Sequence, residues 1–119
     1  MKSYTDIEQS KKLKEILPFE SADMEWLIDY YGLEEPFPLP VKDRVNENEE
    51  PCWSLAALLD ILPTLDERNP EFCKDIRYNQ WHIIYHGTAT LDLIDTERYE
   101  NLIDACYEMI IKLYELNLL

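Results

Sequence analysis

Two histidines four positions apart, His82 and His86, have the spacing in this chain that comes nearest to a metal site. On a helix, imidazoles at i and i+4 lie on one face and can bind a single ion. The residues around them, however, alternate between apolar and polar, which is typical of a β-strand. On a strand the two side chains stand about 13 Å apart, too far to share an ion. We therefore expect no metal and no cofactor here.

The three cysteines, Cys52, Cys73 and Cys106, have neither CxxC nor CxxH spacing, so the common zinc frameworks are excluded. Cys106 falls on the apolar stripe of a predicted helix and is expected to be a small buried side chain. A nucleophilic thiol would need a histidine folded beside Cys52 or Cys73, and neither has basic neighbours on both sides to lower its pKa. We expect reduced, unreactive cysteines.

Carboxylates dominate the charge, with 25 Asp and Glu against 11 Lys and Arg and a formal charge of −14 at pH 7. Such a chain repels nucleic acid and anionic lipid, so neither is an expected partner. Acids are so frequent that pairs such as Asp92 with Asp95 and Asp104 with Glu108 are expected on a solvated surface, without a catalytic role. No GxSxG, HExxH, Walker or EF-hand spacing occurs. We expect a protein without enzymatic activity, and a small enzyme with an unrecognised site stays open.

The uneven distribution of the acids is the better lead to a binding site. Six acids and no Lys or Arg lie between Glu20 and Glu35, with aromatic residues interleaved among them. Acids beside exposed aromatic rings suit a basic protein surface as partner. The candidate binding residues are Trp26, Tyr30, Tyr31, Glu34 and Glu35. The competing interpretation is that these rings belong to the core.

Two further features of the acidic surface stay open. Rows of carboxylates could imitate the phosphates of a nucleic acid and block a DNA-binding protein. A homodimer is also left open.

The N-terminal residues lack the apolar core of a signal peptide, and no run approaches the roughly 20 apolar residues of a membrane span. We therefore expect a cytoplasmic protein that makes no membrane contact.

The elements that position these residues are clearest at the end of the sequence. Apolar residues repeat with a four-three-four-three spacing at Leu102, Cys106, Met109, Leu113 and Leu116. A helix brings such positions onto one stripe, so we expect an amphipathic helix over residues 102–116 whose apolar side is covered.

Two other helices are predicted from capping and periodicity. A capping box at residues 5–8, between Thr5 and Glu8, opens a helix that ends at about Leu17, before Pro18. An apolar helix is predicted over residues 54–62, where Pro63 closes it. Because it is apolar around most of its circumference, we expect it to be central.

The segments between these helices are less regular. Residues 21–31 have an apolar helical face and are predicted to be helical, but the alternation of Trp26, Ile28 and Tyr30 leaves a strand open. Residues 33–51 contain four of the prolines and many acids, which predicts a long extended loop.

Residues 78–94 change to an alternating period, which predicts a β-hairpin. The register that places both apolar sets on one face has a loop at 86–88 and pairs Tyr85 with Ala89, Ile83 with Leu91 and Trp81 with Leu93. Two strands alone are barely stable, so helices must cover them. The predicted fold is α+β, with three to four helices packed on a small antiparallel β-hairpin sheet in a single domain over residues 1–119.

Three sequence blocks carry a resemblance. They are ESADM at 20–24, PCWSLAALL at 51–59 followed by Leu62-Pro63, and DACYEMI at 104–110 followed by Lys112-Leu113. Together they resemble a group of small uncharacterised proteins of anaerobic gut bacteria and their prophages and mobile elements. The resemblance spans about two-thirds of the chain. It implies a cytoplasmic accessory protein with no established activity, and it carries no catalytic residues to transfer.

Overall fold

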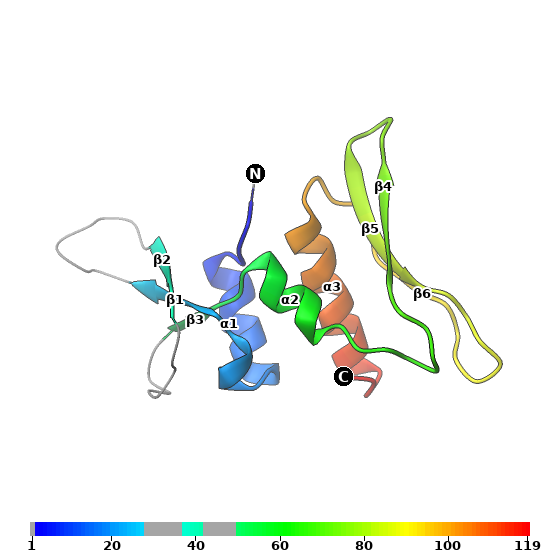
Figure 1. Cartoon of the computed structure of the whole chain (residues 1–119), viewed down its shortest axis with the longest axis horizontal. Coiled ribbons are helices and arrows are strands. Elements are labelled where there is room, and N and C mark those ends of the chain that lie inside the picture. The colour runs from blue at the N-terminus through cyan, green and yellow to red at the C-terminus, as the bar shows by residue number, and fades with distance from the viewer. Residues whose placement is uncertain (1, 28–36, 42–49) are drawn as a thin grey trace. The chain divides into compact units, whose positions relative to one another are not determined.

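The computed structural model describes residues 2–27, 37–41 and 50–119. The chain divides into two compact units: an N-terminal unit over Ser3–Ala57, and a C-terminal unit from Leu58 to Leu119 that includes Lys2. The described residues form three α-helices and two three-stranded antiparallel sheets (Figure 1). The predicted α+β class is therefore confirmed, and the single domain over residues 1–119 stays a prediction.

The N-terminal unit contains one helix and one sheet. Its elements are α1 (Ile7–Ile16), a 3-10 turn (Phe19–Ser21), β1 (Met24–Leu27), β2 (Phe37–Pro40) and β3 (Glu50–Cys52). The sheet has the order β2-β1-β3, so that Trp26 of β1 lies opposite Pro38 on one side and Glu50 on the other. The helix α1 packs beside β3.

The predicted first helix is confirmed, but its capping box begins one residue later than expected. The Gln9 amide donates to the Asp6 carboxylate at 2.8 Å, and the Asp6 amide donates to the Gln9 side chain at 3.1 Å. Thr5 is instead fully buried. Asp and Gln satisfy the free amides as Thr and Glu would have done, so the two registers could not be told apart by residue type.

The helix predicted over residues 21–31 is wrong for residues 21–27, and the strand alternative is confirmed for Met24–Leu27, whereas residues 28–31 lie outside the described part of the chain. The Ser21 hydroxyl, which was expected to cap a helix, donates to the carbonyl of Pro18 at 2.6 Å. Asp23 accepts a hydrogen bond from the Ser54 amide at 2.9 Å, which ties the start of β1 to the chain after β3. Pairing with strands from far along the sequence thus overrides the local helical pattern.

The loop predicted over residues 33–51 is wrong where the structure describes it: residues 37–40 and 50–51 are extended, as expected for a proline-rich stretch, but they belong to paired strands. The prolines of these two strands lie at the edges of the sheet. Pro38 and Pro40 are in β2 and Pro51 is in β3, whereas the central strand β1 has no proline. A proline cannot donate to a ladder, so it is tolerated at an edge and blocks further strand addition there. Both edges of this sheet are therefore protected.

The C-terminal unit has its own sheet covered by a helix. The helix α2 (Leu55–Ile61), at the predicted position, carries the chain from the first unit into the second. Then follow β4 (Glu71–Asp75), β5 (Gln80–Tyr85), β6 (Ile94–Asp95) and α3 (Leu102–Glu115). The sheet order is β4-β5-β6, and α3 packs along β5 (Figure 1).

The predicted terminal helix and its apolar stripe are confirmed over most of their length. Cys106, Met109 and Leu113 of α3 are fully buried, and so are Ile83 and Tyr85 of β5. The two ends of the predicted stripe are exceptions: Leu102 is only half-buried, and Leu116 lies just after the helix and is 54% exposed. The sequence pattern therefore identified the helix and the strand that it covers, but not the ends of the buried stripe.

The predicted hairpin is wrong in its second strand. The strand over residues 80–85 is confirmed, but its neighbours are β4 and the short β6, so that Tyr85 pairs with Ile94 rather than Ala89. The predicted loop 86–88 is replaced by a connection over residues 86–93. Within it, the Thr88 hydroxyl accepts from the Leu91 amide at 3.1 Å, and the Thr88 amide donates to the Leu91 carbonyl at 2.7 Å. This local turn uses backbone groups that a strand would have paired.

None of the helices in the described part of the chain has the length and apolar run needed to cross a membrane.

Candidate functional site

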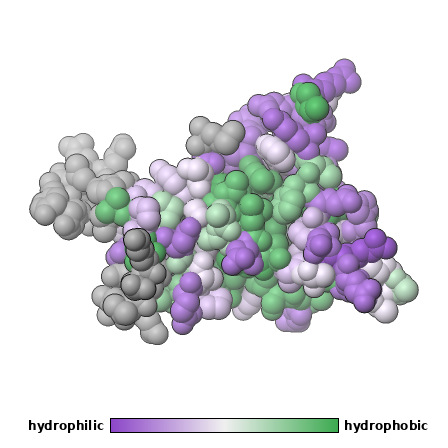
Figure 2. Space-filling model, viewed as in Figure 1, coloured by the Kyte–Doolittle hydropathy of each residue, from purple (hydrophilic) through white to green (hydrophobic). Residues whose placement is uncertain are grey.

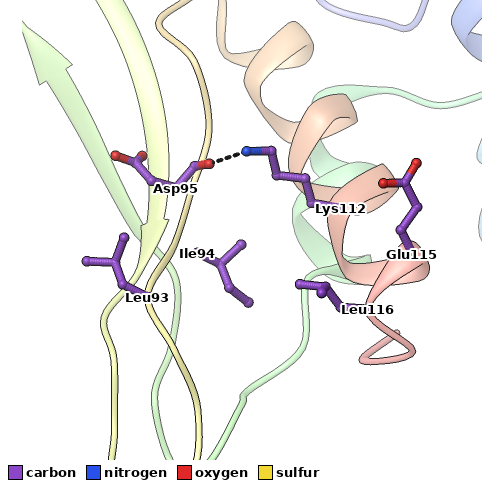
Figure 3. Close-up of a pocket in the computed structure, with 6 residues that line it drawn as sticks. All are labelled: Leu93, Ile94, Asp95, Lys112, Glu115 and Leu116. Atoms are coloured by element: carbon purple, nitrogen blue, oxygen red, sulfur yellow. Dashed lines mark hydrogen bonds between the residues drawn. The ribbon is translucent and has the colours of Figure 1, made fainter.

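A groove lies between the segment that enters β6 and the C-terminal end of α3. Its main pocket has a volume of about 440 Å³ and is lined by Leu93, Ile94, Asp95, Lys112, Glu115 and Leu116 (Figure 3). A second pocket of about 360 Å³ shares Leu93, Ile94 and Leu116 and extends to Thr90 and Leu118. We call these two adjoining pockets the C-terminal groove.

The walls of the C-terminal groove are apolar and accessible. Leu93 is 55% exposed and Leu116 is 54% exposed, whereas Ile94 between them is buried. Figure 3 shows the side chains of Ile94 and Leu116 pointing into the space between β6 and α3. Single exposed leucines are common on protein surfaces, but two that line one groove make a patch that a partner could cover.

The polar groups of the groove are arranged around its rim. The Lys112 ammonium donates to the main-chain carbonyl of Asp95 at 2.6 Å, which links α3 to β6. Lys112 also lies 3.9 Å from the Glu108 carboxylate. Asp92 and Glu115 line the same groove with exposed side chains. The rim is therefore negative on balance, since the carboxylates of Asp92, Asp95 and Glu115 outnumber the ammonium of Lys112.

The turn that ends α3 shapes the groove. The Leu118 amide donates to the Leu113 carbonyl at 2.8 Å, and the Asn117 amide donates to the Tyr114 carbonyl at 3.1 Å. These two bonds form a Schellman motif, and Asn117 has the left-handed conformation that the motif needs, with φ of 58°. Reversal of the chain at Asn117 brings Leu118 back beside Leu116 at the groove.

The candidate binding residues from the sequence are described only in part. Trp26 is half-buried, its indole N–H donates to the Ser10 hydroxyl at 3.0 Å, and its ring meets that of Tyr4 edge to face at 5.8 Å. Tyr30, Tyr31, Glu34 and Glu35 lie outside the described residues. This set stays a prediction, and Trp26 has a packing role in the N-terminal unit in addition to any contact with a partner.

Each histidine pairs with a carboxylate on a neighbouring strand. Nδ1 of His82 lies 2.8 Å from the carboxylate of Asp95, and Nε2 of His86 lies 2.7 Å from that of Glu71. The two side chains thus serve two separate pairs, one on each side of β5. Within residues 2–27, 37–41 and 50–119, no three His, Cys, Asp or Glu side chains form a group that could hold a metal ion.

The fold places Cys73 directly opposite His82, the arrangement that a nucleophilic cysteine would require. However, partial burial raises the pKa of the Cys73 thiol, and the nearby charges of Glu71 and Asp95 raise it further. Burial likewise raises the pKa of Cys52, and it raises the pKa of Cys106 to about 12. All three thiols are therefore held in the protonated, weakly nucleophilic form at neutral pH.

Three of the four carboxylates considered as pairs in the sequence have polar contacts within the fold. Asp95 is bonded to His82, and Asp104 pairs with Lys2 at 2.8 Å and bonds the Asn101 side chain at the start of α3. Glu108 accepts a hydrogen bond from the Glu97 amide at 2.8 Å. These contacts give Asp95, Asp104 and Glu108 a role in holding the fold together.

The C-terminal groove was missed in the sequence because its two most exposed apolar residues, Leu93 and Leu116, fitted regular patterns. Leu116 continued the helical stripe, and Leu93 continued the alternation of the predicted hairpin. No pattern indicated that the helix would end before Leu116 or that the second strand would be replaced by a turn.

Comparisons of the chain with protein-family models, with curated proteins and with solved structures gave no match.

Proposed function

We propose that this chain is a protein-binding module without enzymatic activity, and that its C-terminal groove takes an apolar side chain from a basic segment of the partner. The observation that carries the proposal is the pair Leu93 and Leu116, each more than half exposed at one groove with a negative rim. An accessory role of this kind is compatible with the resemblance to proteins of mobile elements.

The energetics of the groove suit a protein partner. Complete burial of a leucine side chain is worth about 1.5–3 kcal/mol, so covering two half-exposed leucines supplies a useful part of a micromolar affinity. The groove is open to solvent, which suits a side chain presented on a surface better than a small molecule that must be enclosed. Its walls belong to α3 and to the entry of β6, so no large rearrangement is needed.

Charge selects the kind of partner. The chain carries a formal charge of −14, and Asp92 and Glu115 line the groove. A basic segment is attracted during the encounter, and an acidic one is repelled. Because exposed charges are screened within about 10 Å at 0.1 M salt, the association rate should fall as salt is raised.

The test is a selection from a displayed random-peptide library against the native chain. The selected peptides should carry one or two large apolar residues flanked by Lys or Arg. The double variant Leu93→Ser/Leu116→Ser should weaken their binding by about tenfold or more. The matched control is Tyr114→Ser, because Tyr114 is 49% exposed on α3 but does not line the groove. Retention of binding by the leucine variant would overturn the proposal.

The same experiment addresses the alternative of a nucleic-acid mimic. In that case the selected ligands would be rich in Lys and Arg without apolar anchors, and binding would be lost in high salt yet unchanged by the leucine substitutions. That result would replace the groove by the acidic surface as the binding site.

A further inference from the structure

The strand β4 has an outer edge that no other described strand covers. The sheet order is β4-β5-β6, so β4 pairs with β5 on one side only. It spans five residues, Glu71–Asp75, and contains no proline. A regular edge of this length presents unpaired main-chain donors and acceptors to any extended chain that comes alongside.

The other strand edges in the described part of the chain are poorly suited to the addition of another strand. On the far side of the same sheet β6 has only two residues. In the N-terminal unit β2 contains Pro38 and Pro40, and β3 contains Pro51. Proline removes a ladder donor, so these edges resist strand addition. Protection of this kind is missing from β4.

The two faces of β4 differ in chemistry. Phe72 lies opposite Ile83 and therefore on the face that α3 covers, yet the Phe72 ring is 41% exposed. Glu71 and Asp75 are on the other face, and Cys73 lies between them. An added strand would thus meet Phe72 and Lys74, whose ammonium lies over the ring of Trp81, on one face and two carboxylates on the other.

The turn after β4 adds an apolar contact in line with this edge. Ile76 follows the last residue of β4 and is 87% exposed. In Figure 2, a hydrophobic spot stands out on the mostly hydrophilic surface in the region where Figure 1 places the β4–β5 turn. A partner that runs along β4 could cover it.

A second copy of the chain does not fit this edge well. Antiparallel pairing of two β4 strands about Cys73 would place Glu71 of each copy opposite Asp75 of the other. Like charges in direct opposition are destabilising, and each chain already carries a formal charge of −14. An extended segment with basic residues at those two positions avoids the repulsion and gains charge complementarity.

We infer that the outer edge of β4 accepts an extended, basic segment of a partner protein as a fourth, antiparallel strand. Main-chain hydrogen bonds supply the affinity, and alternate side chains supply the specificity. The segment that fits has the order Lys-x-x-apolar-Lys, with its lysines opposite Asp75 and Glu71 and its apolar residue opposite Phe72. This site is separate from the C-terminal groove and does not depend on the function proposed for it.

The test uses the native chain and a capped synthetic peptide with the core Lys-Thr-Val-Phe-Lys, followed by amide NMR. Alternate amides of β4, those that face outward, should shift and exchange with solvent about tenfold more slowly on saturation. An acidic peptide with the core Glu-Thr-Val-Phe-Glu should produce neither effect. Absence of β4 shifts at millimolar basic peptide would overturn the inference.

Two controls separate strand addition from charge attraction alone. One peptide version has N-methyl groups on the residues whose amides face β4, and the other has them on the alternate residues. Only the first should lose binding, and equal binding of both versions would contradict strand pairing.

The protein variants separate this edge from the groove and from self-association. Glu71→Gln with Asp75→Asn should weaken peptide binding by roughly threefold to tenfold. The groove variant Leu93→Ser/Leu116→Ser should bind the peptide as the native chain does, so failure at one site is distinguishable from failure at the other. β4 shifts that depend on protein concentration without peptide would show self-pairing and overturn the choice of a basic partner.

Discussion

Thr5 is the residue on which the buried polar contacts of the N-terminal unit converge. Its hydroxyl accepts a hydrogen bond from the Trp53 amide at 3.1 Å and lies 2.8 Å from the Ser10 hydroxyl. Ser10 in turn accepts from the indole of Trp26 at 3.0 Å. Thr5, Cys52 and Trp53 are all fully buried, so water cannot replace a lost partner.

We predict that Thr5→Val destabilises the protein by about 1–3 kcal/mol, although valine has nearly the same shape. The loss arises because the Trp53 amide and the Ser10 hydroxyl stay buried without their partner. Urea unfolding followed by tryptophan fluorescence measures it. The control is Thr64→Val, whose hydroxyl is exposed and bonded to Asn69, with an expected change below about 0.5 kcal/mol. Equal losses in both variants would contradict the role given to Thr5.

Residue identity alone could not place the candidate sites. The sequence placed His82 correctly in a strand, because the period of two was plain around it, and His86 follows directly after that strand. It could not indicate that Asp95 and Glu71 would pair with them, since those contacts depend on β6 and β4. Carboxylates are too frequent in this chain for any one pairing to stand out.

At the scale of elements, prediction succeeded where one period ran over enough residues. The stripe of α3 and the alternation of β5 were both recognised, and α2 was delimited by Ser54 and Pro63. The strand β4 was missed because three of the five residues in its sequence, Glu-Phe-Cys-Lys-Asp, are charged and its apolar alternation is weak. The stretch Met24–Leu27 fits both periods, and only its partners β2 and β3 decide between them.

The end of α3 offers a test of how an element is terminated. Asn117 has φ of 58°, a conformation in which glycine has no steric cost and alanine is strained. We predict that Asn117→Gly leaves the stability unchanged or raises it by up to about 1 kcal/mol, and that Asn117→Ala lowers it by about 1 kcal/mol. Thermal unfolding followed by circular dichroism ranks the variants.

The matched control for this prediction is Glu115→Gly. Glu115 is the last residue of α3, two positions before Asn117. There glycine is expected to cost about 1 kcal/mol, because the residue has a helical conformation and loses backbone entropy on folding. If glycine were equally harmful at both positions, the Schellman motif would not be what ends α3.

At the scale of the whole molecule, the ionised surface carboxylates and two buried, protonated side chains both affect how the protein behaves as pH rises. The formal charge of −14 favours solubility and disfavours acidic partners. Burial raises the pKa of Tyr85 and that of Cys106 to about 12 each, from ordinary values of 10 and 9. The Tyr85 hydroxyl is also committed to the Pro63 carbonyl at 2.7 Å. Deprotonation of either group is thus easier in the unfolded chain than in the folded one.

We therefore predict that stability falls as pH rises from about 9 toward 12. In this window the unfolded chain binds fewer protons than the folded one, so the free energy of unfolding decreases with pH. Each pKa unit of difference between the folded and the unfolded chain changes the free energy of unfolding by about 1.4 kcal/mol. The expected loss of stability is therefore a few kcal/mol. Urea unfolding at a series of pH values measures it.

The variant Tyr85→Phe identifies the source of this alkaline loss. It should be less stable at pH 7 by about 1 kcal/mol, because the Pro63 carbonyl loses its donor, yet its stability should fall less steeply above pH 10. Tyr114→Phe is the control, since Tyr114 is half-exposed and its substitution should change neither quantity. An unchanged slope in Tyr85→Phe would mean that charge repulsion across the acidic surface, rather than a buried phenol, unfolds the protein in alkali.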